Sequence, residues 1–418
     1  MQMNAPDRNT LLNEGVVAKL LRYVQVDSPS SGEGDAVPST PEQWQMARLL
    51  EAELNALGLR DVKVDEHAIV TATLPGNAPG APAIGLLAHF DTYPGTPGHG
   101  VKPLIHKAYD GGELALPAGP KLSPATHPAL AKVIGHDIIT SDGSTLLGAD
   151  DKAGVAEVME TVCRLLKDPS LPHGDVKVGF TPDEETGKGV AHFDVAGFGA
   201  VAAYTFDGSV LGEVENENFN AANLKVTITG RSSHTGTAKG AMINAVQLAA
   251  EFIAAIPPDM RPETTEGYEG FIHADEVSGG AEQVTVRLLL RDFTESGLTR
   301  QHALVEAILN GLEQRHPGSD TKVAVTGGYQ NMKAFVDKDP RVVNLALQAV
   351  RESGVEPVQK PIRGGTDGAR LSVMGLPTPN LFTGGVNYHS RTEWASAQWM
   401  EKASEVAVRL VGLWANER

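Results

Sequence analysis

The sequence contains very little cysteine. Cys163 is the single cysteine among 418 residues, so no disulfide can form within the chain, and this fits a reducing compartment. It lies in residues 155–166, an apolar segment with helical spacing, where we expect a buried thiol rather than a nucleophile or a ligand. The chain is too long for one ordinary hydrophobic core, so we expect two domains.

Positive charge is also scarce. The chain has 35 Lys and Arg against 52 Asp and Glu, which gives a formal net charge of −17 and a pI near 5.2. Nucleic acids and anionic membrane surfaces attract basic proteins, so neither is expected as a partner. The first ten residues are polar, and no run of eighteen apolar residues occurs. We therefore expect a soluble, cytoplasmic protein.

Three apolar segments with the pattern of buried strands lead into residues that can bind metals or move protons. They are residues 83–88 with His89 and Asp91, residues 176–180 with Glu184 and Glu185, and residues 201–206 with Asp207. Open α/β sheets bind ligands beyond the carboxyl ends of their strands. We therefore expect these polar side chains to lie close together.

The middle of the chain changes character. Between residues 219 and 328 the apolar pattern predicts the order βαββαβ, which is the layout of a ferredoxin-like α+β domain. We expect it to be inserted into an α/β catalytic domain made of residues 1–218 and 329–418. In that domain, residues 11–24 have the spacing of one amphipathic helix, and residues 92–134 read as a long loop without secondary structure.

The candidate chemical groups are histidines and carboxylates, namely His89, Asp91, Asp150, Asp151, Glu184, Glu185, Asp207 and His389. Imidazole nitrogen with carboxylate oxygen suits zinc, cobalt or manganese at a hydrolytic centre. Five protein ligands are too many for one catalytic zinc, but they suit two metals that share a bridging carboxylate. Asp91 lies two residues from His89 on a strand, so it can orient that imidazole. For each motif alone, a solvated turn or a satisfied polar pair is the more common explanation.

Taken together, the motifs resemble a known family, the dinuclear-zinc exopeptidases and deacylases related to aminoacylase, and among them the tripeptide aminopeptidases. The matching segments follow the family's order over nearly the whole chain. They are residues 88–92, 147–154, 180–187, 207–208, 233–236, 362–368 and 388–390. The resemblance implies a zinc-exopeptidase-like three-layer catalytic domain with a mixed sheet, and a homodimer formed through the inserted domain.

The resemblance also assigns the metal ligands. Asp150 would bridge two Zn²⁺ ions per subunit, for which Co²⁺ or Mn²⁺ could substitute. The family's Asp-x-Lys pattern, completed here by Lys152, selects Asp150 over Asp151. The remaining ligands would be His89 and Asp207 on one metal, and Glu185 and His389 on the other.

Further roles follow from the same resemblance. Asp91 would orient His89, and Glu184 would be the general base and acid. His234, in the inserted domain, would stabilise the oxyanion across a dimer interface, although Thr235 replaces the family's usual proline. The substrate's carboxylate end would be held by Arg291, Gly364, Gly365 and Thr366, but a surface ion pair is an equally good explanation of Arg291.

The expected function is therefore that of a metallo-aminopeptidase that removes the N-terminal residue from tripeptides. One alternative is a deacylase or dipeptidase on the same scaffold, and another is a peptide-binding relative without catalytic activity. A magnesium-dependent phosphohydrolase is disfavoured, because the site contains two histidines and the sequence has no Gly-rich phosphate loop before a helix.

Overall fold

A computed structural model describes residues 5–417, which form two compact units. The first comprises the chain up to Asn216, Met332–Lys360 and the chain from Thr366, and the second comprises Glu217–Asn331 and Pro361–Gly365. Within the described part of the chain, no helix is both long and apolar enough to cross a membrane.

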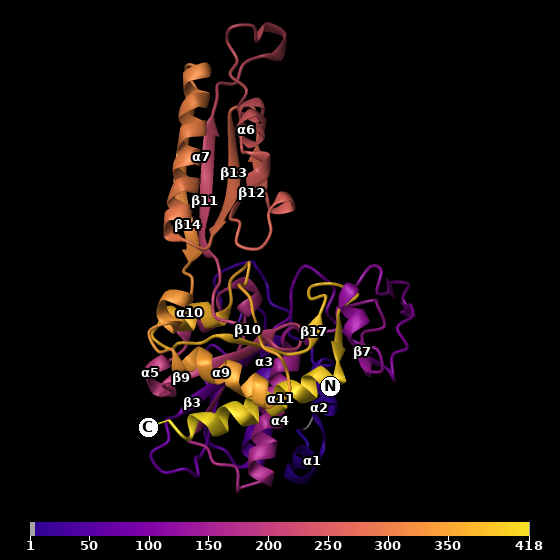
Figure 1. Ribbon diagram of the computed structural model, residues 1–418. Coiled ribbons are helices and arrows are strands. Elements are labelled where there is room, and N and C mark those ends of the chain that lie inside the picture. The colour runs from indigo at the N-terminus through magenta and orange to yellow at the C-terminus, as the bar shows by residue number, and fades with distance from the viewer. Residues whose placement is uncertain (1–4, 418) are drawn as a thin grey trace. The chain divides into compact units, whose positions relative to one another are not determined.

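The first unit is built on an eight-stranded mixed sheet in the order β1-β2-β8-β3-β9-β16-β10-β15. Figure 1 labels β3, β9 and β10 of this sheet. Its strands are β1 (Arg60–Val64), β2 (Val70–Leu74), β3 (Ile84–His89), β8 (Val176–Thr181), β9 (Ala202–Gly208), β10 (Glu213–Glu215), β15 (Val358–Gln359) and β16 (Asn380–Phe382). The central strands β8, β3, β9 and β16 run parallel, whereas β2 pairs antiparallel with β8 and β10 pairs antiparallel with β16. Parallel strands end at one edge of the sheet, so β8, β3 and β9 deliver their last residues to the same place.

Helices flank this sheet. They are α1 (Arg8–Asn13), α2 (Val16–Tyr23), α3 (Gln43–Leu57), α4 (Ala149–Lys167), α5 (Val195–Phe198), α8 (Lys333–Val336), α9 (Arg341–Glu352), α10 (Asp367–Val373) and α11 (Ala397–Trp414). Helix α4 packs on β3 and β9, and α2 and α11 pack on α4. A separate apolar cluster joins Leu87 and Ala203 of the sheet to Phe198 of α5 and Leu371 of α10. Every residue of β3 is buried, as its continuous apolar run predicted.

Two local predictions were wrong. Residues 11–24 do not form one helix, because α1 ends at Asn13 and α2 begins at Val16 after Gly15, which is in an extended conformation. Residues 92–134 are not free of secondary structure. They contain β4 (Leu104–His106), β5 (Leu114–Ala115), β6 (Lys121–Leu122) and a 3₁₀ helix, Pro128–Lys132. Strand β4 belongs to a small sheet in the order β17-β18-β7-β4, with β7 (Ile138–Thr140), β17 (Gly385–Val386) and β18 (Trp394–Ser396).

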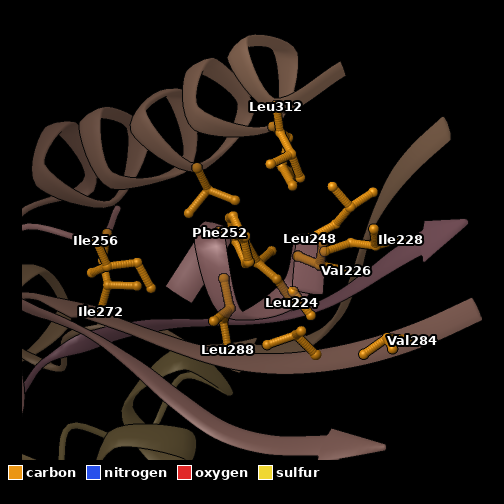
Figure 2. Packing of buried hydrophobic residues seen from close by; sticks show 14 of the residues in the cluster. Leu224, Val226, Ile228, Leu248, Phe252, Ile256, Ile272, Val284, Leu288 and Leu312 are labelled. Carbon is orange, nitrogen blue, oxygen red and sulfur yellow. The ribbon is translucent and has the colours of Figure 1, made fainter. Parts of the chain in front are cut away.

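The second unit has the predicted order βαββαβ. Its elements are β11 (Asn220–Thr229), α6 (Ala245–Ala254), β12 (Phe271–Gly279), β13 (Gln283–Asp292), α7 (Glu295–Arg315) and β14 (Asp320–Tyr329). The antiparallel sheet has the order β12-β13-β11-β14. Alternate residues of the strands, such as Leu224 and Val226, pack against Phe252 of α6 and Leu312 of α7 (Figure 2). This packing is why the period-two and helical apolar patterns could be recognised in the sequence.

Candidate metal centre

The three predicted strand ends meet at the carboxyl edge of the sheet. His89 is the last residue of β3, and Asp207 is the second-last residue of the neighbouring strand β9. Glu184 and Glu185 lie in a 3₁₀ turn, Glu184–Thr186, just after β8 on the other side of β3. The pairing of β8, β3 and β9 therefore brings together groups that are far apart in the sequence.

Asp150 reaches this edge from the start of α4. Gly148 has φ +80°, and Asp150 and Asp151 have non-helical backbone angles before the regular helix continues. A Cβ atom at Gly154 would lie 2.0 Å from the carbonyl oxygen of Phe206 in β9. Glycine at this position therefore allows the first turn of α4 to approach the strand that carries Asp207.

His389 lies on the loop between β17 and β18, with φ +61°. Its ring stacks on Tyr93, with 4.0 Å between ring centroids and 4° between ring planes. Its carbonyl oxygen accepts a hydrogen bond from Thr96 Oγ1 at 2.7 Å. These contacts hold an otherwise exposed histidine in one orientation.

The side chains form two groups that share Asp150. In the first, His89 Nε2 lies 3.0 Å from Asp150 Oδ1 and 3.6 Å from Asp207 Oδ1. In the second, His389 Nε2 lies 3.1 Å from Asp150 Oδ2 and 2.9 Å from Glu185 Oε1. Each carboxylate oxygen of Asp150 therefore faces a different histidine.

These groups fit metal ions. Ligand atoms that sit about 2.0–2.2 Å from a tetrahedral zinc are roughly 3.3–3.6 Å from one another, close to the separations of 2.9–3.6 Å seen here. Glu185 Oε1 is buried and has no hydrogen-bond partner in the described chain, despite its nearness to His389. A cation bound by the second group would satisfy this oxygen.

Asp150 and Asp151 have different surroundings. The carboxylate of Asp151 is buried and accepts hydrogen bonds from the backbone N–H groups of His89, at 3.1 Å, and Gly154, at 3.2 Å. It also lies close enough to His89 and Asp207 to count as a possible ligand. Of the two aspartates, only Asp150 has its carboxylate oxygens close to both His89 and His389. Asp150 is therefore the better placed of the two to bridge a pair of metal ions.

Asp91 supports more of the centre than its spacing from His89 predicted. The fully buried carboxylate lies 3.1 Å from His89 Nδ1. It also accepts hydrogen bonds from the backbone N–H groups of Glu184, at 3.0 Å, and Glu185, at 3.3 Å. One side chain thus fixes both an imidazole and the turn that carries the two glutamates.

Electrostatics show that the protein groups repel one another at this edge. Burial, followed by the charge of Asp207, raises the pKa of Glu184 well above its usual value. Burial and the charge of Asp150 raise the pKa of Glu185 to about 8. Burial opposes the charged form of His389, but the nearby carboxylates of Asp150 and Glu185 stabilise it and raise the pKa of His389 to about 10. Crowded carboxylates hold protons unless a cation neutralises them.

The remaining predicted residues lie elsewhere in the fold. His234 is exposed in the second unit, and its Nδ1 accepts a hydrogen bond from the Gly236 N–H at 3.1 Å. Arg291 donates to Asn223 Oδ1 at 3.1 Å and lies over the ring of Tyr329. Gly364 and Gly365 belong to the second unit, whereas Thr366 begins the next segment of the first unit and caps α10.

The sequence did not reveal several residues that support the centre. Asp183 has φ +49°, is buried, and accepts hydrogen bonds from Ser39 N–H, at 2.6 Å, and Gln43 Nε2, at 2.7 Å. It is adjacent to Glu184, so these contacts anchor the turn that bears both glutamates. Glu393 and Tyr93 were also missed. The only signal was their nearness in sequence to motif residues.

Comparisons with known proteins agree with this geometry. The profile of peptidase family M20/M25/M40 matches residues 143–412. The chain is 46% identical to peptidase T of Escherichia fergusonii over 405 residues, which are 96% of this chain and 99% of that protein. It is 45% identical to peptidase T of Geobacillus thermodenitrificans over 405 residues, covering 96% and 98%. The crystal structure of aminopeptidase PepT from Bacillus cereus superposes with a TM-score of 0.75 at 26% identity, covering 96% and 98%. The resemblance inferred from the motifs is confirmed.

Proposed function

The chain belongs to peptidase family M20/M25/M40, and from that premise we propose that it is a dizinc aminopeptidase that removes the N-terminal residue of tripeptides. The observation that carries the proposal is the position of Asp150, whose two oxygens lie 3.0 and 3.1 Å from two different imidazole nitrogens. A shared carboxylate between two sets of ligands is the arrangement that a two-metal hydrolase requires.

We assign the ligands as follows. His89, Asp207 and one oxygen of Asp150 would hold one zinc, and His389, Glu185 and the other oxygen of Asp150 would hold the second. Bound zinc polarises a carbonyl group and makes water a better nucleophile at neutral pH. Cobalt and manganese accept the same nitrogen and oxygen donors, so they could replace zinc.

Glu184 is the proposed general base and acid. Its turn is held by Asp91, so its carboxyl group is kept beside the ligands instead of moving with a flexible loop. It would take a proton from the attacking water and return a proton to the leaving amine nitrogen. Asp91 would orient both His89 and this turn.

Substrate recognition completes the proposal. Within the described chain no carboxylate pairs with Arg291, which donates only to Asn223 and to the Leu290 carbonyl, so its guanidinium could form an ion pair with the carboxylate end of a short peptide. Gly364, Gly365 and Thr366 would bind the same end of the peptide. His234 would be supplied to the oxyanion by a second copy of the chain in a homodimer. A His234→Ala chain mixed with a Glu184→Ala chain should then recover partial activity, and no recovery despite proven subunit exchange would contradict this role.

The decisive assay is a panel of free and N-acetylated dipeptides, tripeptides and tetrapeptides, incubated with the zinc-loaded protein. We expect release of the first residue from free tripeptides and little cleavage of acetylated ones. Preferential cleavage of acetylated substrates would indicate a deacylase, and preferential cleavage of dipeptides a dipeptidase. Binding of peptides without cleavage would indicate a non-catalytic relative. We place the activity in the cytoplasm, where the buried thiol of Cys163 stays reduced.

A further inference from the structure

We infer that Glu393 is a positioning residue that ties the loop bearing Asp150 to the loop bearing His389 and thereby sets the geometry of the shared ligand. The inference rests on the proposed metal centre. Glu393 is 1% exposed and lies between His389 and the first residue of β18, Trp394. It does not face either imidazole at the distance of a ligand.

Glu393 accepts three backbone hydrogen bonds from one short segment of chain. Its Oε2 accepts from the N–H groups of Leu147 and Gly148, each at 2.8 Å, and its Oε1 accepts from the N–H of Asp150 at 2.9 Å. Three N–H groups that converge on one carboxylate form strong, charge-assisted hydrogen bonds. They use both oxygens, so an amide at this position would turn a donor toward at least one of these N–H groups.

The three hydrogen bonds to Glu393 affect Asp150 because of the backbone conformation of this segment. Gly148 is left-handed and Asp150 has non-helical backbone angles, so the segment lacks the usual helical hydrogen bonds that would fix its direction. Glu393 supplies acceptors for these N–H groups instead. Because its hydrogen bond fixes the backbone of Asp150, it also fixes where the Asp150 carboxylate points.

Glu393 also belongs to the segment between β17 and β18 that carries His389. His389 is four residues before Glu393, and its own position is held by Tyr93 and Thr96. Glu393 therefore links two ligands that are 239 residues apart in sequence but 3.1 Å apart in space. Supporting groups of this kind typically change metal affinity by about 10- to 100-fold when they are removed.

The test replaces Glu393 with glutamine. In E393Q, either the Asp150 N–H or the pair from Leu147 and Gly148 would face an amide N–H₂ instead of an oxygen. The full-length apoprotein is titrated with Zn²⁺ against a chromophoric chelator, and the Co²⁺-loaded form is examined by its visible absorption spectrum. We expect at least one of two metal equivalents to bind about 10- to 100-fold more weakly, with an altered cobalt spectrum. Excess metal should restore part of the lost activity.

Glu53→Gln is the matched control. Glu53 is also fully buried and also accepts charge-assisted hydrogen bonds, from Arg22 Nε at 2.8 Å and Tyr23 Oη at 2.5 Å, but it contacts none of the proposed ligands. E53Q should lower the free energy of unfolding while both metal equivalents bind as in the unaltered chain. A general loss of packing would instead affect the two variants alike, and that result would overturn the inference.

A second variant covers the case in which E393Q does not fold. E393D keeps the charge but withdraws the carboxylate by one methylene, so its metal affinity should lie between those of the unaltered chain and E393Q. Normal affinity and a normal cobalt spectrum in the folded variants would overturn the role of Glu393 alone. Failure of the unaltered chain to bind two metals would overturn the proposed function, and this inference with it.

Discussion

Two buried clusters of charged side chains lie in the first unit, and they differ in balance. In the first cluster, at the carboxyl edge of the sheet, the acids outnumber the two imidazoles, with His89 and His389 against Asp91, Asp150, Glu184, Glu185 and Asp207. In the second, around α2, α3 and α4, every acid lies beside a cation: Lys19, Arg22 and Arg164 pair with Glu14, Glu53 and Glu160, and Arg164 also pairs with the exposed Glu401 of α11.

The difference in balance separates a binding site from a structural network. In the second cluster the charged groups are neutralised by ion pairs with one another. Lys19 Nζ, for example, lies 2.9 Å from Glu160 and donates to the carbonyl oxygens of Leu11 and Glu14. The first cluster leaves Glu185 Oε1 without a hydrogen bond and raises the pKa of Glu184. A buried excess of carboxylates is stable only if cations or protons neutralise it.

Removal of metal gives the largest expected effect. Dialysis against a chelator should abolish peptide hydrolysis, and added zinc or cobalt should restore it, because the carboxylate-rich cluster depends on cations that the protein does not supply. Peptidase assays before and after chelation measure this. Activity that is indifferent to chelation would show that the imbalance of charge has another explanation.

Glu184→Ala should reduce kcat by about 10²- to 10⁴-fold, the range for loss of a general base. The metal content, measured by atomic emission, should stay near that of the unaltered chain, since the turn around Glu184 is held by the backbone and by Asp91. Loss of metal from this variant would mean that Glu184 and Glu185 have exchanged roles.

Lys19→Met tests the balanced cluster. It removes the partner of Glu160 and leaves a buried carboxylate with Arg164 alone, so the free energy of unfolding should fall by about 3 kcal/mol. Urea denaturation measures the change. Metal content and kcat of the folded variant should be unchanged, because this network touches none of the ligands. Combined replacement with Glu160→Gln should recover part of the lost free energy of unfolding. A loss of metal from Lys19→Met would contradict the view that the two clusters have separate roles.

Glu157→Met gives the smallest expected effect and concerns an acid that belongs to neither cluster. Glu157 is fully buried in α4, and neither of its oxygens has a hydrogen-bond partner in the described chain. Methionine should therefore raise the free energy of unfolding by about 1–3 kcal/mol.

The stabilisation by Glu157→Met should also depend on pH, in a direction that follows from the pKa of Glu157. Burial, with a smaller contribution from Asp151, raises the pKa of Glu157 well above its ordinary value. A raised pKa in the folded chain favours folding while Glu157 is protonated. This contribution to the free energy of unfolding is fully present below the pKa of glutamate in the unfolded chain, and it is lost as the pH rises through the raised pKa of the folded chain. The advantage of Glu157→Met should thus grow with pH in denaturation series, and an advantage that shrinks with pH would contradict the assignment.

Much of the fold could be predicted because its signals are local. The apolar run before His89 predicted a strand buried on both faces, and the alternation of Leu224 and Val226 predicted the sheet of the second unit. The break between α1 and α2 was missed because the apolar spacing continues across Gly15 while the backbone there does not. Short strands such as β5 were missed because two residues carry no periodicity.

The sequence by itself determined which chemical groups are present, since side chains that can bind metals follow strands whose hydrophobic pattern can be read without coordinates. The resemblance selected Asp150 over Asp151, but only the tertiary structure gave the physical reason, since the backbone angles at the start of α4 turn Asp150 toward both histidines. The tertiary structure also decided the place of Glu393, whose partners are backbone N–H groups. Every residue except proline offers such a group, so no pattern of side chains could have revealed it.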